Sequence, residues 1–146
     1  MSFYVRYYVA DEDDLTLGQL AAGLQEFDPA YAVPHENDSG ELHYAGDVYA
    51  QIEINRPGDG LFDEELEETL DGVALTGGPR AQHVIDTLRE VRQTVALRVL
   101  WQGRDSEQTL TKIDPVLVWL MMNREGMLQV DGEGFYEGEE LIFEME

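Results

Sequence analysis

Apolar and polar residues alternate without interruption along the segment 3–9, and this period of two predicts a β-strand. After an acidic run, apolar residues recur every three or four positions over 17–27, which is the spacing of an amphipathic helix that ends at Asp28-Pro29. The segment 79–101 contains both periods in succession, first helical and then alternating. We therefore expect a helix there that lies close to the sheet and leads directly into one of its strands.

The same patterns predict the remaining elements. Asp114-Pro115 is a typical start for a helix that stops near Gly126, whereas the segment 107–113 fits either a strand or a helix. We also expect a short edge strand at 31–33, a β-hairpin at 41–55, a short helix at 63–71, strands at 127–130 and 141–145, and a glycine-rich turn at 131–138.

The order of these elements predicts a single α+β domain that spans residues 1–146. We expect an antiparallel or mixed sheet with helices packed on one face. The first elements follow the order of a ferredoxin-like sandwich, which a C-terminal helix and a β-hairpin would then extend. Element order alone carries no function, because this architecture hosts many activities.

The chain is strongly acidic, since 31 Asp and Glu residues against 9 Lys and Arg residues give a formal net charge of −22. Such a surface suits a salt-rich cytosol, a basic protein partner or the mimicry of nucleic acid, and the three interpretations stay open. Direct binding to nucleic acid or anionic lipid is not expected, because phosphate contact needs clustered cations.

A hydrophobic fraction of 43% predicts a folded core despite the charge. The chain has no Cys, which excludes disulfides, thiolate metal sites and cysteine nucleophiles. Its first residues include no basic region typical of a signal peptide, and the longest apolar run, 116–122, is far short of the roughly 20 residues of a membrane helix. We therefore expect a cytoplasmic protein with no membrane association.

One face of the expected sheet is a candidate binding surface. If Val5, Ile52 and Leu97 point toward the helices, the alternation sends another set of side chains to the opposite face. On that face, arginine guanidinium groups could bind carboxylates through two parallel hydrogen bonds, and tyrosines would provide an aromatic ring with a hydroxyl group at its end. A covering helix and a simple cross-strand Arg6–Glu53 pair are the alternatives. The candidate binding residues are Tyr4, Arg6, Tyr8, Tyr49, Gln51, Glu53 and Arg98.

A second candidate surface lies on the expected helix 63–71. Successive turns of a helix place charges roughly 5–6 Å apart, which is near the spacing of phosphates along a nucleic-acid strand. A row of carboxylates at this spacing could imitate nucleic acid, or it could be the solvated outer face of an amphipathic helix. The acidic stripe consists of Glu64, Glu67, Glu68 and Asp71.

The remaining polar clusters do not match a known metal or cofactor motif. His35 and His43 lie near Glu36 and Glu41, but their spacing differs from that of a helical two-histidine metal motif. The acidic tract 131–140 lacks the glycine required at the sixth position of an EF-hand loop. We expect no metal site, no cofactor and no catalytic residue.

These observations predict an interaction protein that has no chemistry of its own and contacts a protein partner through the tyrosine- and arginine-bearing sheet face. The acidic surface would suit a basic partner, and a homo-oligomer stays open. The alternatives are a small enzyme or small-ligand-binding protein of unknown class, and an acidic mimic of nucleic acid.

Overall fold

The computed structural model describes residues 3–145, which form four helices and one large antiparallel sheet. The strands lie in the order β2-β4-β5-β6-β1-β7-β8-β9, and β3 pairs with β4. The predicted α+β class with an antiparallel sheet is therefore confirmed. The elements are β1 (Tyr4–Val9), α1 (Leu17–Phe27), β2 (Tyr31–Ala32), β3 (His35–Glu36), β4 (Ser39–Tyr44), β5 (Asp47–Asn55), α2 (Gly60–Thr76), α3 (Ala81–Arg89), β6 (Gln93–Val99), α4 (Ser106–Asn123), β7 (Gly126–Val130), β8 (Gly134–Glu137) and β9 (Glu140–Glu144).

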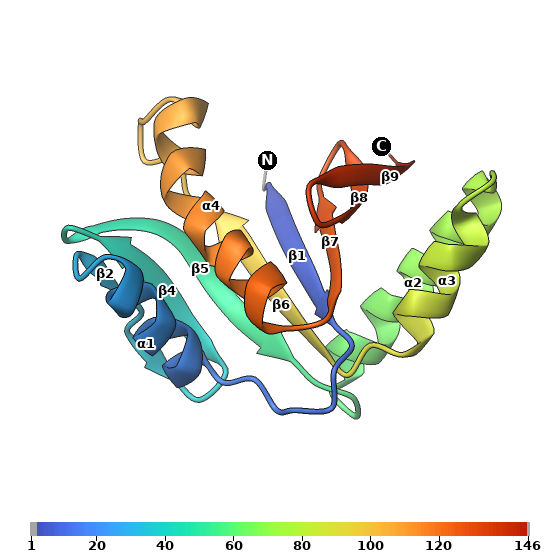
Figure 1. Cartoon of the computed structure of the whole chain (residues 1–146), viewed down its shortest axis with the longest axis horizontal. Helices are drawn as coiled ribbons and strands as arrows, with labels where there is room; N and C mark the ends of the chain where they lie inside the picture. Colours follow the sequence, from blue (N-terminus) through green and yellow to red (C-terminus); the bar gives the residue numbers. More distant parts are fainter. Residues whose placement is uncertain (1–2, 146) are drawn as a thin grey trace.

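Helices α1 and α4 cover one face of the sheet (Figure 1). Three leucines of α1, Leu17, Leu20 and Leu24, are buried. The first turn of the helix is fixed by Thr16, whose hydroxyl accepts a hydrogen bond from the Gln19 amide, while the Thr16 amide donates one to the Gln19 side chain. The apolar residues of this first core come from both helices and from the strands beneath them. They include Leu17, Leu20, Leu24, Ile113, Val116, Leu120, Val5, Val95, Leu97, Ile52 and Ile54.

The α2–α3 helix pair packs on the opposite face, and Figure 1 shows it standing apart from α1 and α4. Tyr7 and Tyr8 are neighbours in β1, and they belong to the first and the second core respectively because successive side chains of a strand point to opposite faces. The expectation of helices on one face alone is therefore wrong. The second core contains Tyr8, Phe62, Val73, Ala81, Val84, Leu88, Val91, Met127, Phe135 and Phe143.

Helix α4 begins earlier than its sequence predicts. It starts at Ser106, where the Asp105 side chain accepts a hydrogen bond from the Gln108 amide at 2.8 Å, and Pro115 lies inside the helix. The proline costs one backbone hydrogen bond, but Ile113 and Leu117 on either side of it are buried against the sheet and hold the helix in place. No helix in the described part of the chain is long and apolar enough to cross a membrane.

Six of the elements occur along the chain in the order β-α-β-β-α-β, with other elements between some of them: β1, α1, β5, β6, α4 and β7. Their strands are ordered β7-β1-β6-β5 in the sheet. The ferredoxin-like comparison rests on this order and stays a prediction. The α2–α3 pair is inserted between β5 and β6, and the predicted turn 131–138 contains strand β8. Helix α3 ends at Arg89 and β6 begins at Gln93, so the predicted passage from helix to strand in 79–101 is confirmed.

Candidate functional site

On the second face of the sheet, side chains of neighbouring strands line up in three transverse rows. The register of β4, β5, β6 and β1 aligns Glu41, Gln51, Arg98 and Tyr4 in the first row. The second row contains Ser39, Glu53, Ala96, Arg6 and, on β7, Gln129. The third row contains Asn55, Thr94, Tyr8 and Met127.

Burial changes from row to row. Every residue of the third row is buried, with exposures between 1% for Met127 and 5% for Asn55 and Thr94, because the α2–α3 pair lies over it. In the first two rows, Gln51, Glu53 and Arg98 are exposed, and no residue of these rows belongs to either buried core. This uncovered part is called the open sheet face, and its candidate binding residues are Tyr4, Arg6, Gln51, Glu53 and Arg98.

Tyr8 lies on the predicted face but inside the second core. Its hydroxyl donates a hydrogen bond to the side chain of Gln129 at 2.7 Å, and its ring packs against Phe135 with 6.2 Å between the centroids. Burial raises the pKa of the Tyr8 hydroxyl. Tyr8 therefore holds the helix pair to the sheet and is not available to a partner.

Tyr49 lies on the other face, in the first core, so its predicted placement is wrong. A register shift between Leu42 and His43 makes Tyr49 the additional residue of a bulge in the β4–β5 pair, and period two fails at that point. The guanidinium of Arg104 stacks over the Tyr49 ring at 3.9 Å and donates hydrogen bonds to the carbonyls of Val48 and Leu100. Tyr49 and Arg104 thus hold the bulge in position beside α4.

Arg6 is paired within the chain. Its guanidinium lies 3.3 Å from a carboxylate oxygen of Asp131 and 4.7 Å from the centre of the Tyr4 ring. The other oxygen of Asp131 accepts a hydrogen bond from the Tyr4 amide at 2.9 Å. Ala96 stands between Arg6 and Glu53 in the second row, so the alternative of an Arg6–Glu53 pair is not realised.

Arg98 is the cation at the centre of the open sheet face. It donates a hydrogen bond to the Gln51 side chain at 3.2 Å, and no carboxylate of residues 3–145 lies within ion-pair distance of it. Most of its donors are therefore directed to solvent in a chain that has 31 acidic residues. The arrangement can bind a carboxylate or a peptide carbonyl presented from outside the chain.

The acidic stripe on α2 has the geometry that its spacing predicts. Glu64, Glu67, Glu68 and Asp71 are all exposed, while Phe62 on the opposite side of the helix is buried in the second core. Each of the four carboxylates lacks an ion pair with the described residues. This is the arrangement of a solvated outer helix face, and it is equally compatible with a cationic partner.

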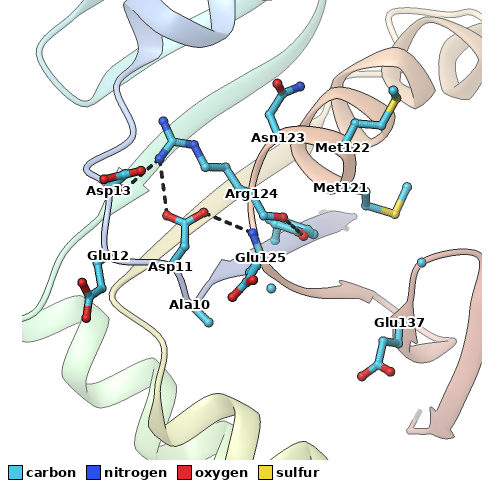
Figure 2. Close-up of a pocket in the computed structure, with 13 residues that line it drawn as sticks. Ala10, Asp11, Glu12, Asp13, Met121, Met122, Asn123, Arg124, Glu125 and Glu137 are labelled. Carbon is cyan, nitrogen blue, oxygen red and sulfur yellow. Dashed lines mark hydrogen bonds and ion pairs between the residues drawn. The ribbon is translucent and has the colours of Figure 1, made fainter.

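The described structure contains an acidic cleft of about 950 Å³ (Figure 2). It lies where the end of β1, the end of α4 and the β8–β9 turn meet, and those segments are far apart in the sequence. Sequence reasoning missed it for that reason. Figure 2 shows Glu137 across the opening from the α4 end, and the acidic residues that line the cleft are Asp11, Glu12, Asp13, Glu125 and Glu137.

Arg124 and Asp11 form the frame of this cleft. Arg124 donates hydrogen bonds to the Asp11 carboxylate at 3.4 Å and to the Asp13 carbonyl at 2.9 Å, and Asp11 accepts a further bond from the Glu125 amide. The Tyr7 hydroxyl donates to the Arg124 carbonyl at 2.8 Å, and burial raises the pKa of Tyr7 to about 12. The only cation of the lining is therefore engaged by its neighbours, and the cleft attracts positive charge.

The histidines are separate from one another. His35 contacts the Val33 carbonyl, His43 contacts Glu41 at 3.1 Å, and His83 contacts Glu137 at 2.6 Å. Within residues 3–145, no three His, Asp or Glu side chains form a group that could hold a metal ion.

Comparison with models of known protein families, with curated proteins and with solved structures finds no match to this chain.

Proposed function

We propose that this chain is an interaction protein that binds a protein partner on the open sheet face and carries out no chemistry there. The observation that supports the proposal most directly is the environment of Arg98. This exposed arginine lies among the polar side chains of the open sheet face and forms no ion pair with a carboxylate of the described residues. A guanidinium in that position is free to donate bidentate hydrogen bonds to a carboxylate of the partner.

The composition of the rows defines the complementary surface. Glu53 lies beside Arg98 on the exposed face, so the partner would offer a cation at one position and a carboxylate at the next. Tyr4 and Gln51 flank Arg98 directly and add a flat ring and an amide. A mixed surface of this kind sets the register of the complex through alternating charges rather than through net charge.

The experiment is an affinity capture from the lysate of the source organism, followed by titration of any purified partner. Wild type is compared with Arg98→Glu, which reverses the one unpaired cation of the face without disturbing the Arg6–Asp131 pair. The matched control is Arg89→Glu, because Arg89 is also exposed and also lacks an ion pair with the described residues, but it lies on α3. We expect Arg98→Glu to lower the affinity for the partner at least ~10-fold. Arg89→Glu should leave this affinity within about 2-fold of the wild-type value.

The other outcomes contradict the proposal in different ways. A partner that both variants retain and that salt releases would place binding on the acidic cleft or the acidic stripe, and would favour a basic ligand or nucleic-acid mimicry. Failure to capture any partner, together with a small molecule that stabilises the protein in a thermal-shift screen, would favour the small-ligand or enzyme alternative.

A further inference from the structure

An apolar groove of about 380 Å³ runs between α1 and α4, on the face of the sheet opposite the open sheet face. It is called the α1–α4 groove, and its apolar lining includes Gly23, Phe27, Pro115, Val118, Trp119 and Met122. It is separate from the acidic cleft, although Met122 and Asn123 at the end of α4 contribute to both.

Gly23 allows the Trp119 side chain to lie close against the backbone of α1, and both residues line the groove. A Cβ atom at position 23 would lie 2.0 Å from Nε1 of Trp119, so any other residue there would have to displace the Trp119 side chain. The rim is unusually apolar for a surface, since Phe27 is 69% exposed, Val118 45% and Met122 80%. Exposed apolar residues that gather around a groove mark a contact with another molecule.

The charge around the groove identifies the kind of molecule. The whole chain has 31 acidic residues, yet Asp114 is the only charged residue that lines the groove. A basic partner would gain most on the acidic surfaces and would have no use for this neutral one. A like-charged partner needs a contact that brings few carboxylates together, and a second copy of this chain is such a partner because only Asp114 of each copy would lie in the contact.

We propose that the α1–α4 groove is the contact between two copies of this chain in a two-fold symmetric dimer. In such a contact the same patch serves both subunits, so it must contain both a projection and a hollow. The groove meets this condition, because the exposed Phe27 and Met122 side chains project from the rim of the hollow over Gly23 and Trp119.

The dimer has a consequence for binding. The two grooves face each other, so the two open sheet faces point outward and away from the contact. A bivalent partner would then engage both subunits and bind more tightly than a single site allows. This consequence rests on the proposed function, whereas the dimer itself does not.

The test is sedimentation equilibrium of the purified protein, over a wide concentration range and at about 0.1 M and 1 M salt. We expect a monomer–dimer equilibrium that tightens with salt, because screening reduces the repulsion between two chains of charge −22. The double variant Phe27→Asp, Met122→Asp should raise the dissociation constant at least ~100-fold. The matched control is Leu75→Asp, since Leu75 is 90% exposed but lies on α2, and it should change the constant less than about 2-fold.

A second measurement needs no charged substitution. With Trp101→Phe, Trp119 is the only tryptophan, and its emission should shift to shorter wavelength as concentration raises the dimer population. Arg98→Glu should leave the dissociation constant unchanged, which separates the dimer from the proposed partner site. A monomer at every concentration and salt would overturn the proposal, as would a dimer that persists in the double variant.

Discussion

The two faces of the sheet are built from the same strands but are covered very differently. On one face, α1 and α4 bury apolar side chains along β5, β6 and β1. On the other face, the α2–α3 pair buries only the third transverse row and the C-terminal strands, and the first two rows stay polar and open. Both faces obey the same alternation, so alternation alone does not determine which residues become core. The position of the covering helices decides it.

The largest expected effect comes from the fully covered face. Leu97 lies on β6 and is completely buried between the sheet and the two helices. Leu97→Ala should lower the free energy of unfolding by about 3 kcal/mol, because it removes buried methyl groups and leaves a cavity. Urea unfolding followed by circular dichroism measures the change, and a loss below about 1 kcal/mol would mean that this face is packed more loosely than the structure shows.

The next largest effect is a change in the free energy of unfolding at alkaline pH. It comes from the ionisation of Tyr7, which belongs to the first core. Its pKa is raised from 10.0 to about 12, mainly by burial and then by the charges of Asp11 and Glu125, so folding favours its neutral form. The stability that this adds is complete below pH 10 and is lost as pH rises toward 12. Tyr7→Phe should therefore flatten the fall of stability between pH 10 and 12, measured by urea unfolding at each pH. An unchanged slope would contradict this assignment.

A smaller effect tests the partly covered face. Tyr8→Phe keeps the ring in the second core but removes the hydroxyl that donates to Gln129. The loss should be about 1 kcal/mol in the free energy of unfolding, the net value of a typical internal hydrogen bond. Gln129→Ala alone is the companion variant, since it leaves the buried Tyr8 hydroxyl without its acceptor, and a loss smaller than that of Tyr8→Phe would contradict the role given to this bond.

The smallest effect on stability belongs to the open sheet face. Arg98→Ala should change the free energy of unfolding by less than about 0.5 kcal/mol, because the side chain is exposed and has only one internal hydrogen bond. Arg6→Ala should cost somewhat more, about 0.5–1 kcal/mol, since it breaks the partly exposed pair with Asp131. Equal costs for the two variants would remove the distinction between a free and a paired arginine on which the proposed function depends.

Local patterns predicted most of the elements. The alternation of 3–9 corresponds to β1, the helical spacing of 17–27 to α1, and the two successive periods of 79–101 to α3 and β6. These patterns are reliable because each reflects one buried side of one element, and that side can be seen in a few neighbouring residues. The same reasoning placed Tyr4, Arg6, Gln51, Glu53 and Arg98 on a common face, as the register shows.

The errors share a cause, which is that distant contacts overrule local preference. Pro115 is a good start for a helix, but α4 is capped by Asp105, nine residues before the predicted cap Asp114. The buried residues on both sides of the proline hold it inside the helix. Tyr49 was assigned to the wrong face because a bulge depends on the partner strand, which the pattern of one strand does not contain.

Alternation along each strand is a local property of covalent geometry, and the residues alone therefore predicted which side chains share a face. Which part of that face is buried depended on the α2–α3 pair, which is inserted between β5 and β6 and folds back over Tyr8. The acidic cleft and the α1–α4 groove likewise form only where segments far apart in the sequence meet. These surfaces are created by the packing of distant elements and not by the spacing of residues within one element, because a cavity requires walls from several elements at once.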